Sequence, residues 1–180
     1  MNEQLQQQII NRVREVPDFP KPGISFKDIT PVLADPALCR RIVSELLEQL
    51  EPFHFDAVVG IESRGFLFSM LLARELNIPF VPVRKKGKLP WHTAEVEYAL
   101  EYGTDCLQIH SDALKPGDRV LIHDDLLATG GTAAATCQLI EKLGATVGAI
   151  AILLSLDFLP GRQKLYAHTA NIISLVGYQS

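Results

Sequence analysis

The stretch that most constrains this chain is Val120–Thr132, which reads VLIHDDLLATGGT. Its first four residues are apolar apart from His123, which is typical of a short buried strand. Two adjacent carboxylates, Asp124 and Asp125, come where that strand is expected to end, and a glycine turn leads into a helical pattern up to Leu143. A strand, a glycine loop and a helix in this order form an anion site, because the first N–H groups of a helix lack partners and glycines allow close approach.

The two carboxylates restrict which anion such a loop can hold. A triphosphate loop carries a lysine directly after its glycines, and this loop has none. Carboxylates beside a phosphate site suit a ligand with vicinal hydroxyls, because they accept hydrogen bonds from a diol. Thr129 and Thr132 can add hydroxyl donors. The stretch therefore predicts a sugar-phosphate site, whereas an acid pair and an ordinary glycine turn remain the structural alternative.

Composition limits the class of protein. A chain of 180 residues with 47% hydrophobic and 21% charged residues fits one globular domain over 1–180. Its net charge of −4 and the lack of a basic tail argue against nucleic acid as a main partner. The longest apolar run, Val147–Leu156, is too short to span a membrane.

The amino terminus and the cysteines indicate a cytoplasmic protein. The first ten residues are polar and rich in glutamine, unlike a signal peptide. Cys39, Cys106 and Cys137 are far apart and form no C-x-x-C pair, which fits a reducing compartment better than a disulfide or metal site.

Hydrophobic periodicity predicts an α/β fold. Strands alternate with helices from residue 36 to 155, so we expect a central parallel sheet of about five strands flanked by helices on both faces. The expected helices cover residues 4–14, 36–51, 66–76 and the run after the glycine turn. The expected strands cover residues 56–61, 79–83, 106–109, 120–123, 146–154 and 171–176.

Residues 16–36 carry five prolines and a glycine, which no long helix or central strand tolerates. A rigid, irregular segment of this size is typical of a lid or binding loop, and we expect it to form a small hood on the core. Phe19 and Phe26 are its aromatic residues. They can anchor the segment to the core or stack on a flat ligand, and the pattern alone favours anchoring.

Two further segments carry ligand-binding chemistry. The turn Ser63-Arg64-Gly65 follows a buried strand, where α/β sheets bind ligands. Residues 84–88 hold four cations, which form either a solvated surface or a clamp for a polyphosphate, and the sugar-phosphate loop favours the clamp. The stretch from there to Ala99 lacks clean periodicity and suggests a mobile loop over about 85–103, with residues 100–109 forming a hairpin.

VLIHDDLLATGGT resembles the phosphoribosyl-pyrophosphate motif of the type I phosphoribosyltransferases. The strings DFPKPGISFKDITPVL, SRGFLF, RKKGKLP and LEYG resemble the adenine phosphoribosyltransferases, and the resemblance runs from Asp18 to Val176. It implies the type I phosphoribosyltransferase fold, transfer of a phosphoribosyl group from phosphoribosyl pyrophosphate to adenine, Mg²⁺ and a homodimer. The Mg²⁺ is expected to be held mainly by substrate oxygens and water, because no metal-ligand cluster appears.

The resemblance also implies roles for individual residues. Asp124 and Asp125 would hold the ribose hydroxyls. The 5-phosphate would lie against Ala128, Thr129, Gly130, Gly131 and Thr132. The pyrophosphate side would comprise Ser63, Arg64, Arg84, Lys85 and Lys88, of which Arg64 and Lys88 are also expected to act in catalysis. The resemblance further implies a cis peptide bond between Glu62 and Ser63.

Adenine would lie in the hood, against Ser25, Phe26 and Lys27, so the resemblance favours stacking for Phe26 where the pattern favoured anchoring. Glu101, followed by Tyr102, matches the family's acidic residue near the purine imidazole ring and would handle its proton.

Some positions depart from the family pattern. His123 replaces an aliphatic residue, and a hydrogen-bonded core histidine is favoured over a catalytic one. Trp91, His92 and Lys27 are also unusual, so the loop contacts and hood details are open. Two other functions remain: the same transfer to hypoxanthine, guanine, xanthine or orotate, and a regulator that senses the sugar pyrophosphate without catalysis. Adenine is favoured because Ala128 stands where the 6-oxopurine enzymes carry a proton-handling aspartate.

Overall fold

The computed structural model describes residues 2–99 and 103–180, and its internal contacts form two compact units, Met1–Leu50 and Glu51–Ser180. The first unit begins with a helix, α1, whose amide N–H of Leu5 is capped by the side chain of Asn2 at 3.1 Å. Its elements are α1 (Glu3–Arg12), β1 (Arg14–Val16), β2 (Phe26–Asp28), α2 (Thr30–Leu33) and α3 (Pro36–Leu50). Whether residues 1–180 form a single domain stays a prediction.

The proline-rich segment holds only short elements, as its sequence predicts. β1 and β2 are three residues each and pair in antiparallel register, with Glu15 opposite Lys27. α2 adds a single turn of helix that carries Pro31 in its first turn, where the missing proline N–H costs nothing.

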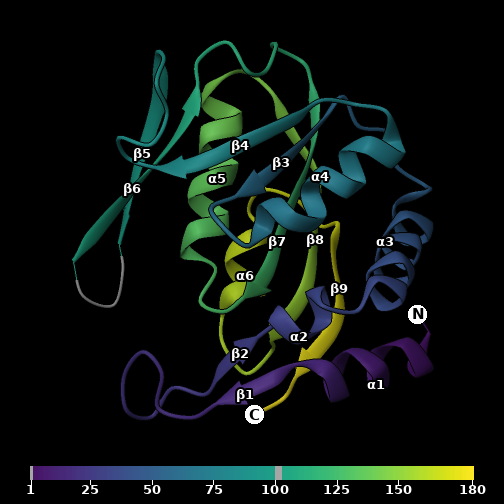
Figure 1. The fold of residues 1–180 in the computed structure, drawn as a ribbon. Coiled ribbons are helices and arrows are strands. Elements are labelled where there is room, and N and C mark those ends of the chain that lie inside the picture. The colour runs from purple at the N-terminus through teal and green to yellow at the C-terminus, as the bar shows by residue number, and fades with distance from the viewer. Residues whose placement is uncertain (1, 100–102) are drawn as a thin grey trace. The chain divides into compact units, whose positions relative to one another are not determined.

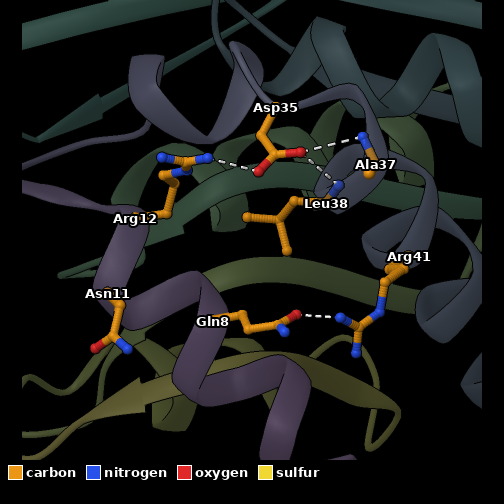
Figure 2. Close-up of a pocket in the computed structure, with 7 residues that line it drawn as sticks. All are labelled: Gln8, Asn11, Arg12, Asp35, Ala37, Leu38 and Arg41. Carbon is orange, nitrogen blue, oxygen red and sulfur yellow. Dashed lines mark hydrogen bonds and ion pairs between the residues drawn. The ribbon is translucent and has the colours of Figure 1, made fainter.

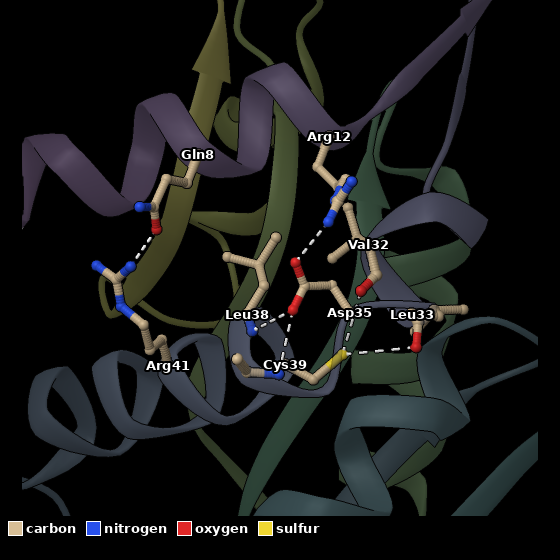
Figure 3. A network of polar contacts seen from close by, with 9 residues as sticks. Gln8, Arg12, Val32, Leu33, Asp35, Leu38, Cys39 and Arg41 are labelled. Atoms are coloured by element: carbon tan, nitrogen blue, oxygen red, sulfur yellow. Dashed lines mark hydrogen bonds and ion pairs between the residues drawn. The ribbon is translucent and has the colours of Figure 1, made fainter.

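Asp35 caps the amino end of α3. Its carboxylate accepts the backbone N–H groups of Ala37 at 3.1 Å and Leu38 at 3.0 Å, and it pairs with Arg12 of α1 at 2.7 Å (Figure 2). This satisfies donors that the first turn of a helix leaves free. The thiol of Cys39 donates to the carbonyl of Val32 at 3.3 Å (Figure 3), so it is a local hydrogen-bond donor within the first unit.

The second unit is built on one sheet (Figure 1). Within the described residues its strand order is β5-β6-β4-β3-β7-β8-β9. The five strands from β4 to β9 in this order are parallel, as predicted, and β6 and β5 add an antiparallel edge. The strands are β3 (Ala57–Ile61), β4 (Phe80–Lys85), β5 (Thr93–Ala99), β6 (Thr104–His110), β7 (Arg119–Leu127), β8 (Thr146–Leu156) and β9 (Ile172–Tyr178), and the helices are α4 (Gly65–Leu76), α5 (Gly131–Lys142) and α6 (Gly161–Leu165).

Helices cover both faces of this sheet. Val59 and Ile61 of β3 belong to a buried cluster that includes Cys137 of α5. Gly60, which lies between them, faces α4, because a Cβ there would lie 2.7 Å from the hydroxyl of Ser69. Alternate residues of a strand point to opposite faces, so α4 and α5 lie on opposite sides of the sheet, as expected.

The end of β7 and the presence of β5 differ from the sequence predictions. β7 does not end at the acid pair but continues to Leu127, because Leu126 and Leu127 keep pairing with β8 and Leu127 is buried. Residues Thr93–Ala99, which lack a clear pattern, form β5 in full register with β6. The strand has one exposed face, and its charged residues alternate with partly buried ones, which weakens the apolar signal.

Candidate functional site

The phosphate loop lies at the carboxyl end of β7, where it turns into α5. Gly130 takes a left-handed conformation, with φ at 76°, and precedes the first residue of the helix. Its carbonyl accepts the N–H of Ala134 at 2.9 Å, so the helix starts directly at the glycine pair. Because α5 has no side-chain cap, its first N–H groups are available for an anion, as the sequence predicts.

Gly161 at the start of α6 packs against the backbone of this loop. It is not identified as a site residue by the sequence alone. A Cβ at Gly161 would lie 2.1 Å from the carbonyl oxygen of Ala128 and 3.1 Å from the backbone nitrogen of Gly130. Only glycine allows α6 to approach the phosphate loop so closely. The Pro160-Gly161 dipeptide after a buried strand is the turn signal that marks the position.

The acid pair, Asp124 and Asp125, lies near the carboxyl end of β7, shortly before the phosphate loop begins at Ala128. Asp125 is buried, with 4% of its surface exposed, and Asp124 is partly buried. Burial raises the pKa of both carboxyl groups, and for Asp124 the neighbouring charge of Asp125 raises the pKa further. Arg64 opposes this by pairing its Nε with Asp125 Oδ2 at 3.0 Å. The predicted ribose-binding acids and the predicted pyrophosphate-binding arginine are therefore in contact.

Gly65 allows this contact, because it places the start of α4 against β7. A Cβ at Gly65 would lie 2.8 Å from Asp124 Oδ1 and 3.0 Å from the carbonyl oxygen of His123. β3 and β7 are neighbouring parallel strands, so their carboxyl ends bring the Ser63-Arg64-Gly65 turn beside the acid pair. The Glu62–Ser63 peptide bond is cis, as the resemblance implies.

Glu62 joins this turn to the cationic segment. Its carboxylate accepts the backbone N–H of Lys85 at 2.8 Å and two guanidinium contacts from Arg84, each at 3.3 Å. Burial raises the pKa of Glu62, but the hydrogen bond from Lys85 and the charge of Arg84 outweigh it and leave the pKa below its ordinary value. Arg84 Nη1 also donates to the carbonyl of Lys88 at 3.1 Å. Through Arg84, Glu62 therefore holds in place the segment that is predicted to bind pyrophosphate.

Two other cations of the segment, Lys85 and Lys86, are already paired. Lys85 contacts Asp105 of β6 at 3.0 Å, and Lys86 contacts Glu95 of β5 at 3.1 Å. These pairs tie β5 and β6 to the cationic segment. Mobility of residues 85–103 stays a prediction, and Glu101 and Tyr102 lie outside the described residues.

The predicted hood residues lie in the first unit. Ser25 is exposed, whereas Lys27 is buried to 6% exposure and pairs with Glu15 across the two strands. Phe26 meets Phe19 edge to face, with ring centroids 5.1 Å apart. These contacts hold the proline-rich segment together internally. The stacking role of Phe26 stays a prediction.

His123 is a core residue, as predicted, and its ring interacts with the backbone of Ala151. It is fully buried, and neither ring nitrogen reaches a hydrogen-bond partner of good geometry among the described residues. Burial lowers the pKa of His123 to about 4, and the backbone of Ala151 offsets little of that shift. The ring is therefore neutral at physiological pH and packs edge to face with Phe68.

A hollow of about 390 Å³ lies within the first unit, between α1 and α3 (Figure 2). Its two arginines are already bonded, Arg12 to Asp35 and Arg41 to Gln8 (Figure 3). It contains none of the residues expected to bind substrate. Its polar side chains join two helices, and we assign it no ligand.

Among residues 2–99 and 103–180, no three potential ligands from His, Cys, Asp and Glu gather closely enough to hold a metal ion. In the same part of the chain, no helix has the length and apolar character needed to cross a membrane.

Comparison with known proteins agrees with this geometry. Residues 28–174 match the family model described as phosphoribosyl transferase domain. An adenine phosphoribosyltransferase from Cytophaga hutchinsonii is 52% identical over 174 residues, which is 97% of this chain and 96% of that protein. The crystal structure of the Rhodothermus marinus adenine phosphoribosyltransferase shares 50% identity with a TM-score of 0.93, over 98% of this chain and 100% of the other.

A structure from Saccharomyces cerevisiae, solved in complex with adenine and an iminoaltritol bisphosphate, is 39% identical with a TM-score of 0.89. It covers 97% of this chain and 99% of its own. The acid pair, the glycine loop and these matches along nearly the whole length lead to one conclusion: the chain belongs to the adenine phosphoribosyltransferase family, within the type I phosphoribosyltransferases.

Proposed function

We propose that this chain transfers the 5-phosphoribosyl group from phosphoribosyl pyrophosphate to adenine, giving AMP and pyrophosphate in purine salvage. The observation that carries the proposal is the acid pair beside an uncapped glycine loop, with Arg64 in contact with Asp125. At the carboxyl ends of β3 and β7, this arrangement offers hydrogen-bond acceptors for ribose hydroxyls, donors for a phosphate and a cation for the leaving group.

The reaction exchanges one bond at the anomeric carbon. A nitrogen of adenine forms a bond to that carbon, the bond to the pyrophosphate oxygen breaks, and the electron pair leaves with pyrophosphate. The transition state resembles an oxocarbenium ion, so the site must stabilise the departing negative charge. Arg64, Arg84 and Lys88 supply the positive charge that stabilises the leaving pyrophosphate. Glu62 holds Arg84, which in turn donates to the Lys88 carbonyl.

Binding of the substrate requires Arg64 to leave Asp125. In the free chain Arg64 partly neutralises the buried acid pair. When ribose hydroxyls donate to the two carboxylates, their charge is stabilised by new hydrogen bonds, and Arg64 becomes available to the pyrophosphate. The buried acid pair can thus bind the ribose diol without retaining Arg64, which the pyrophosphate needs as a counter-charge.

Adenine is positioned by the hood residues Ser25, Phe26 and Lys27 in this proposal, with Phe26 stacked on the purine. The proton on the imidazole ring of adenine must leave as the new bond forms, and Glu101 accepts it as the general base. Ala128 cannot take this role, because its side chain carries no titratable group.

Mg²⁺ fits the proposed site through the substrate rather than through a protein cage. Asp124 and Asp125 are hard oxygen donors next to the phosphate loop, as Mg²⁺ prefers, but they do not form a three-ligand cluster with other described residues. We expect the ion to be held by pyrophosphate and ribose oxygens and by water. When bound, it would neutralise negative charge on the leaving group.

A homodimer in the cytoplasm completes the proposal. Leu67, Met70 and Leu71 form an exposed apolar stripe at helical spacing on α4, which suits a second copy of the chain. Cys39, Cys106 and Cys137 are all free thiols, which fits a reducing compartment. Sedimentation of the chain and of Met70→Glu tests the dimer, because the charge should shift the variant toward monomer.

The test of the activity is to incubate the chain with phosphoribosyl pyrophosphate, Mg²⁺ and adenine, and to quantify AMP and pyrophosphate. Equal amounts of both products are expected. Pyrophosphate formed without AMP would indicate hydrolysis, and no turnover with tight binding of the sugar pyrophosphate would support a sensing regulator instead.

A further inference from the structure

The short helix α6 places Gly161 against the phosphate loop, as Figure 1 shows beside α5. A Cβ at Gly130 would lie 2.7 Å from the carbonyl oxygen of Gly161, so the backbones of helix and loop are in contact from both sides. Leu165 anchors the far end of α6 in the core beneath α5. The first turn has no such anchor of its own, because α6 has only five residues and Pro160 before it carries no side-chain group that can cap an N–H.

Arg162, the neighbour of Gly161, joins this first turn to β9. Its Nη1 donates to the carbonyl of Ile172 at 3.0 Å, and its Nη2 donates to the hydroxyl of Ser174 at 2.7 Å. The planar guanidinium suits such a pair of acceptors, because its N–H groups form a rigid fork. Two of the three nitrogens of Arg162 are thus used on β9, and they fix the start of α6.

Two serines extend this contact to the turn that precedes α6. The hydroxyls of Ser174 and Ser155 are 3.1 Å apart, and Ser155 donates to Asp157 Oδ1 at 2.7 Å. Ser155 is only 1% exposed, so water competes little for these bonds. A hydrogen-bonded chain Arg162–Ser174–Ser155–Asp157 therefore closes the turn over residues 158–161.

The other end of this turn is also built against β9. The N–H of Asp157 donates to the carbonyl of Tyr178 at 2.8 Å, and Gln179 Nε2 donates to Asp157 Oδ2 at 3.2 Å. A Cβ at Gly177 would lie 2.2 Å from the same Oδ2, so β9 has a glycine where the carboxylate needs room. Both ends of the turn that presents Gly161 are therefore held by β9.

We propose that Arg162 is a positioning residue for the 5-phosphate: it locks α6 to β9 and so keeps Gly161 as a fixed support for Ala128 and Gly130. Backbone N–H groups hold a phosphate well only when they point at one place. The loop keeps that geometry as long as the backbone behind it does not yield. The inference rests on the proposed function, because it takes the ligand of this loop to be a sugar 5-phosphate.

A direct ion pair between Arg162 and the phosphate is the competing explanation, and two variants separate the two. Arg162→Lys keeps the positive charge but lacks the planar fork that serves both acceptors on β9. Ser174→Ala keeps Arg162 and removes one of those acceptors. Positioning predicts that both variants weaken the 5-phosphate site, whereas a direct ion pair predicts that both leave it intact.

The experiment measures by calorimetry the binding of ribose 5-phosphate, and separately of pyrophosphate with Mg²⁺, to the wild-type chain and the two variants. Arg74→Lys is the matched control, because the side chain of Arg74 is 76% exposed in the last turn of α4. Arg162→Lys should bind ribose 5-phosphate about tenfold more weakly, and Ser174→Ala about threefold more weakly. The control should bind it as the wild type does.

Pyrophosphate distinguishes positioning from a general loss of stability. Its expected partners Arg64 and Arg84 are held by Asp125 and Glu62, so its Kd should change by less than about twofold in every variant. In steady-state kinetics, kcat/KM for phosphoribosyl pyrophosphate should fall about tenfold in Arg162→Lys while KM for adenine stays within about twofold.

Three outcomes would overturn the positioning role. The first is ribose 5-phosphate affinity equal to that of the control in Ser174→Ala, which also decides the matter if Arg162→Lys does not fold. The second is an equal loss of affinity for ribose 5-phosphate and pyrophosphate. The third is a wild-type chain that does not bind ribose 5-phosphate at all.

The same data separate this role from the proposed function. If the wild type makes no AMP but both variants lose affinity for ribose 5-phosphate alone, the function is wrong and the positioning role holds. If the wild type makes AMP and both variants match the control, the function holds and the positioning role is wrong.

Discussion

Replacing Gly161 by alanine should displace the phosphate loop. The added Cβ would lie 2.1 Å from the carbonyl oxygen of Ala128, whereas ordinary van der Waals contacts begin at 3.4 Å. Both partners are backbone, so the two segments must separate by about 1 Å or more. A misplacement of about 1 Å can lower the rate about 10²-fold, so kcat/KM for phosphoribosyl pyrophosphate should fall by roughly that factor.

The assay measures initial rates against phosphoribosyl pyrophosphate at saturating adenine, together with the melting temperature. Overpacking costs about 1–3 kcal/mol, so Gly161→Ala should melt earlier but still fold. Lys164→Ala is the control, because Lys164 is exposed on the same helix. A folded Gly161→Ala enzyme with the kcat/KM of the control would refute the role of Gly161.

Three further substitutions test the acids of the site. Asp124→Asn should lower kcat/KM at least tenfold, because a charge-assisted hydrogen bond contributes about 1.5–3 kcal/mol. It should also raise the melting temperature of the ligand-free chain at neutral pH, because burial, and then the charge of Asp125, raise the pKa of Asp124. The stability that this group contributes is fully present below its unfolded pKa of 3.8 and is lost as pH rises through the folded pKa. That gain should shrink on acidification, and a pH-independent gain would contradict it. Glu62→Gln should raise KM for phosphoribosyl pyrophosphate about tenfold with adenine KM unchanged, because Arg84 loses its counter-charge, and steady-state kinetics decide the matter. Glu101→Gln should slow turnover about 10²-fold or more, and a fully active variant would remove Glu101 from the mechanism.

The parallel core of the second unit follows from its sequence. Buried strands such as Ala57–Ile61 are continuous apolar runs, and helices follow them in the order that a parallel sheet requires. Asp35 at the start of α3 and Gly144 after the end of α5 are signals of local chemistry alone: the Asp35 carboxylate accepts a helix N–H, and the Gly144 N–H donates to the carbonyl of Glu141. These signals are local, so they do not depend on the rest of the fold.

The elements that the sequence did not reveal depend on distant partners. β5 has an exposed face, and its place is set by pairing with β6 and by the contact of Tyr98 with the phosphate loop. β7 runs past the acid pair because β8 offers partners for Leu126 and Leu127. Neither feature can be read from the periodicity of the segment itself.

The candidate site could be predicted in part for the same reason. The acid pair and the glycine loop share one short stretch, so their proximity follows from the sequence. The close approach of Gly161, the bond network of Glu62 and the ion pair between Arg64 and Asp125 join segments that are far apart in the chain. His123 is a buried core residue, as predicted, and its interaction with the backbone of Ala151 on β8 joins two strands that the local sequence does not connect.

The most direct test of the account is a comparison of kcat/KM for adenine and hypoxanthine under identical conditions with phosphoribosyl pyrophosphate and Mg²⁺. Adenine offers donors at its 6-amino group, whereas hypoxanthine presents an acceptor, so one of them leaves buried groups unpaired in the hood. We expect adenine to be preferred by about 10⁴-fold or more. Comparable efficiency with the two bases, or a preference for hypoxanthine, would contradict the assignment of the base and of the residues that bind it.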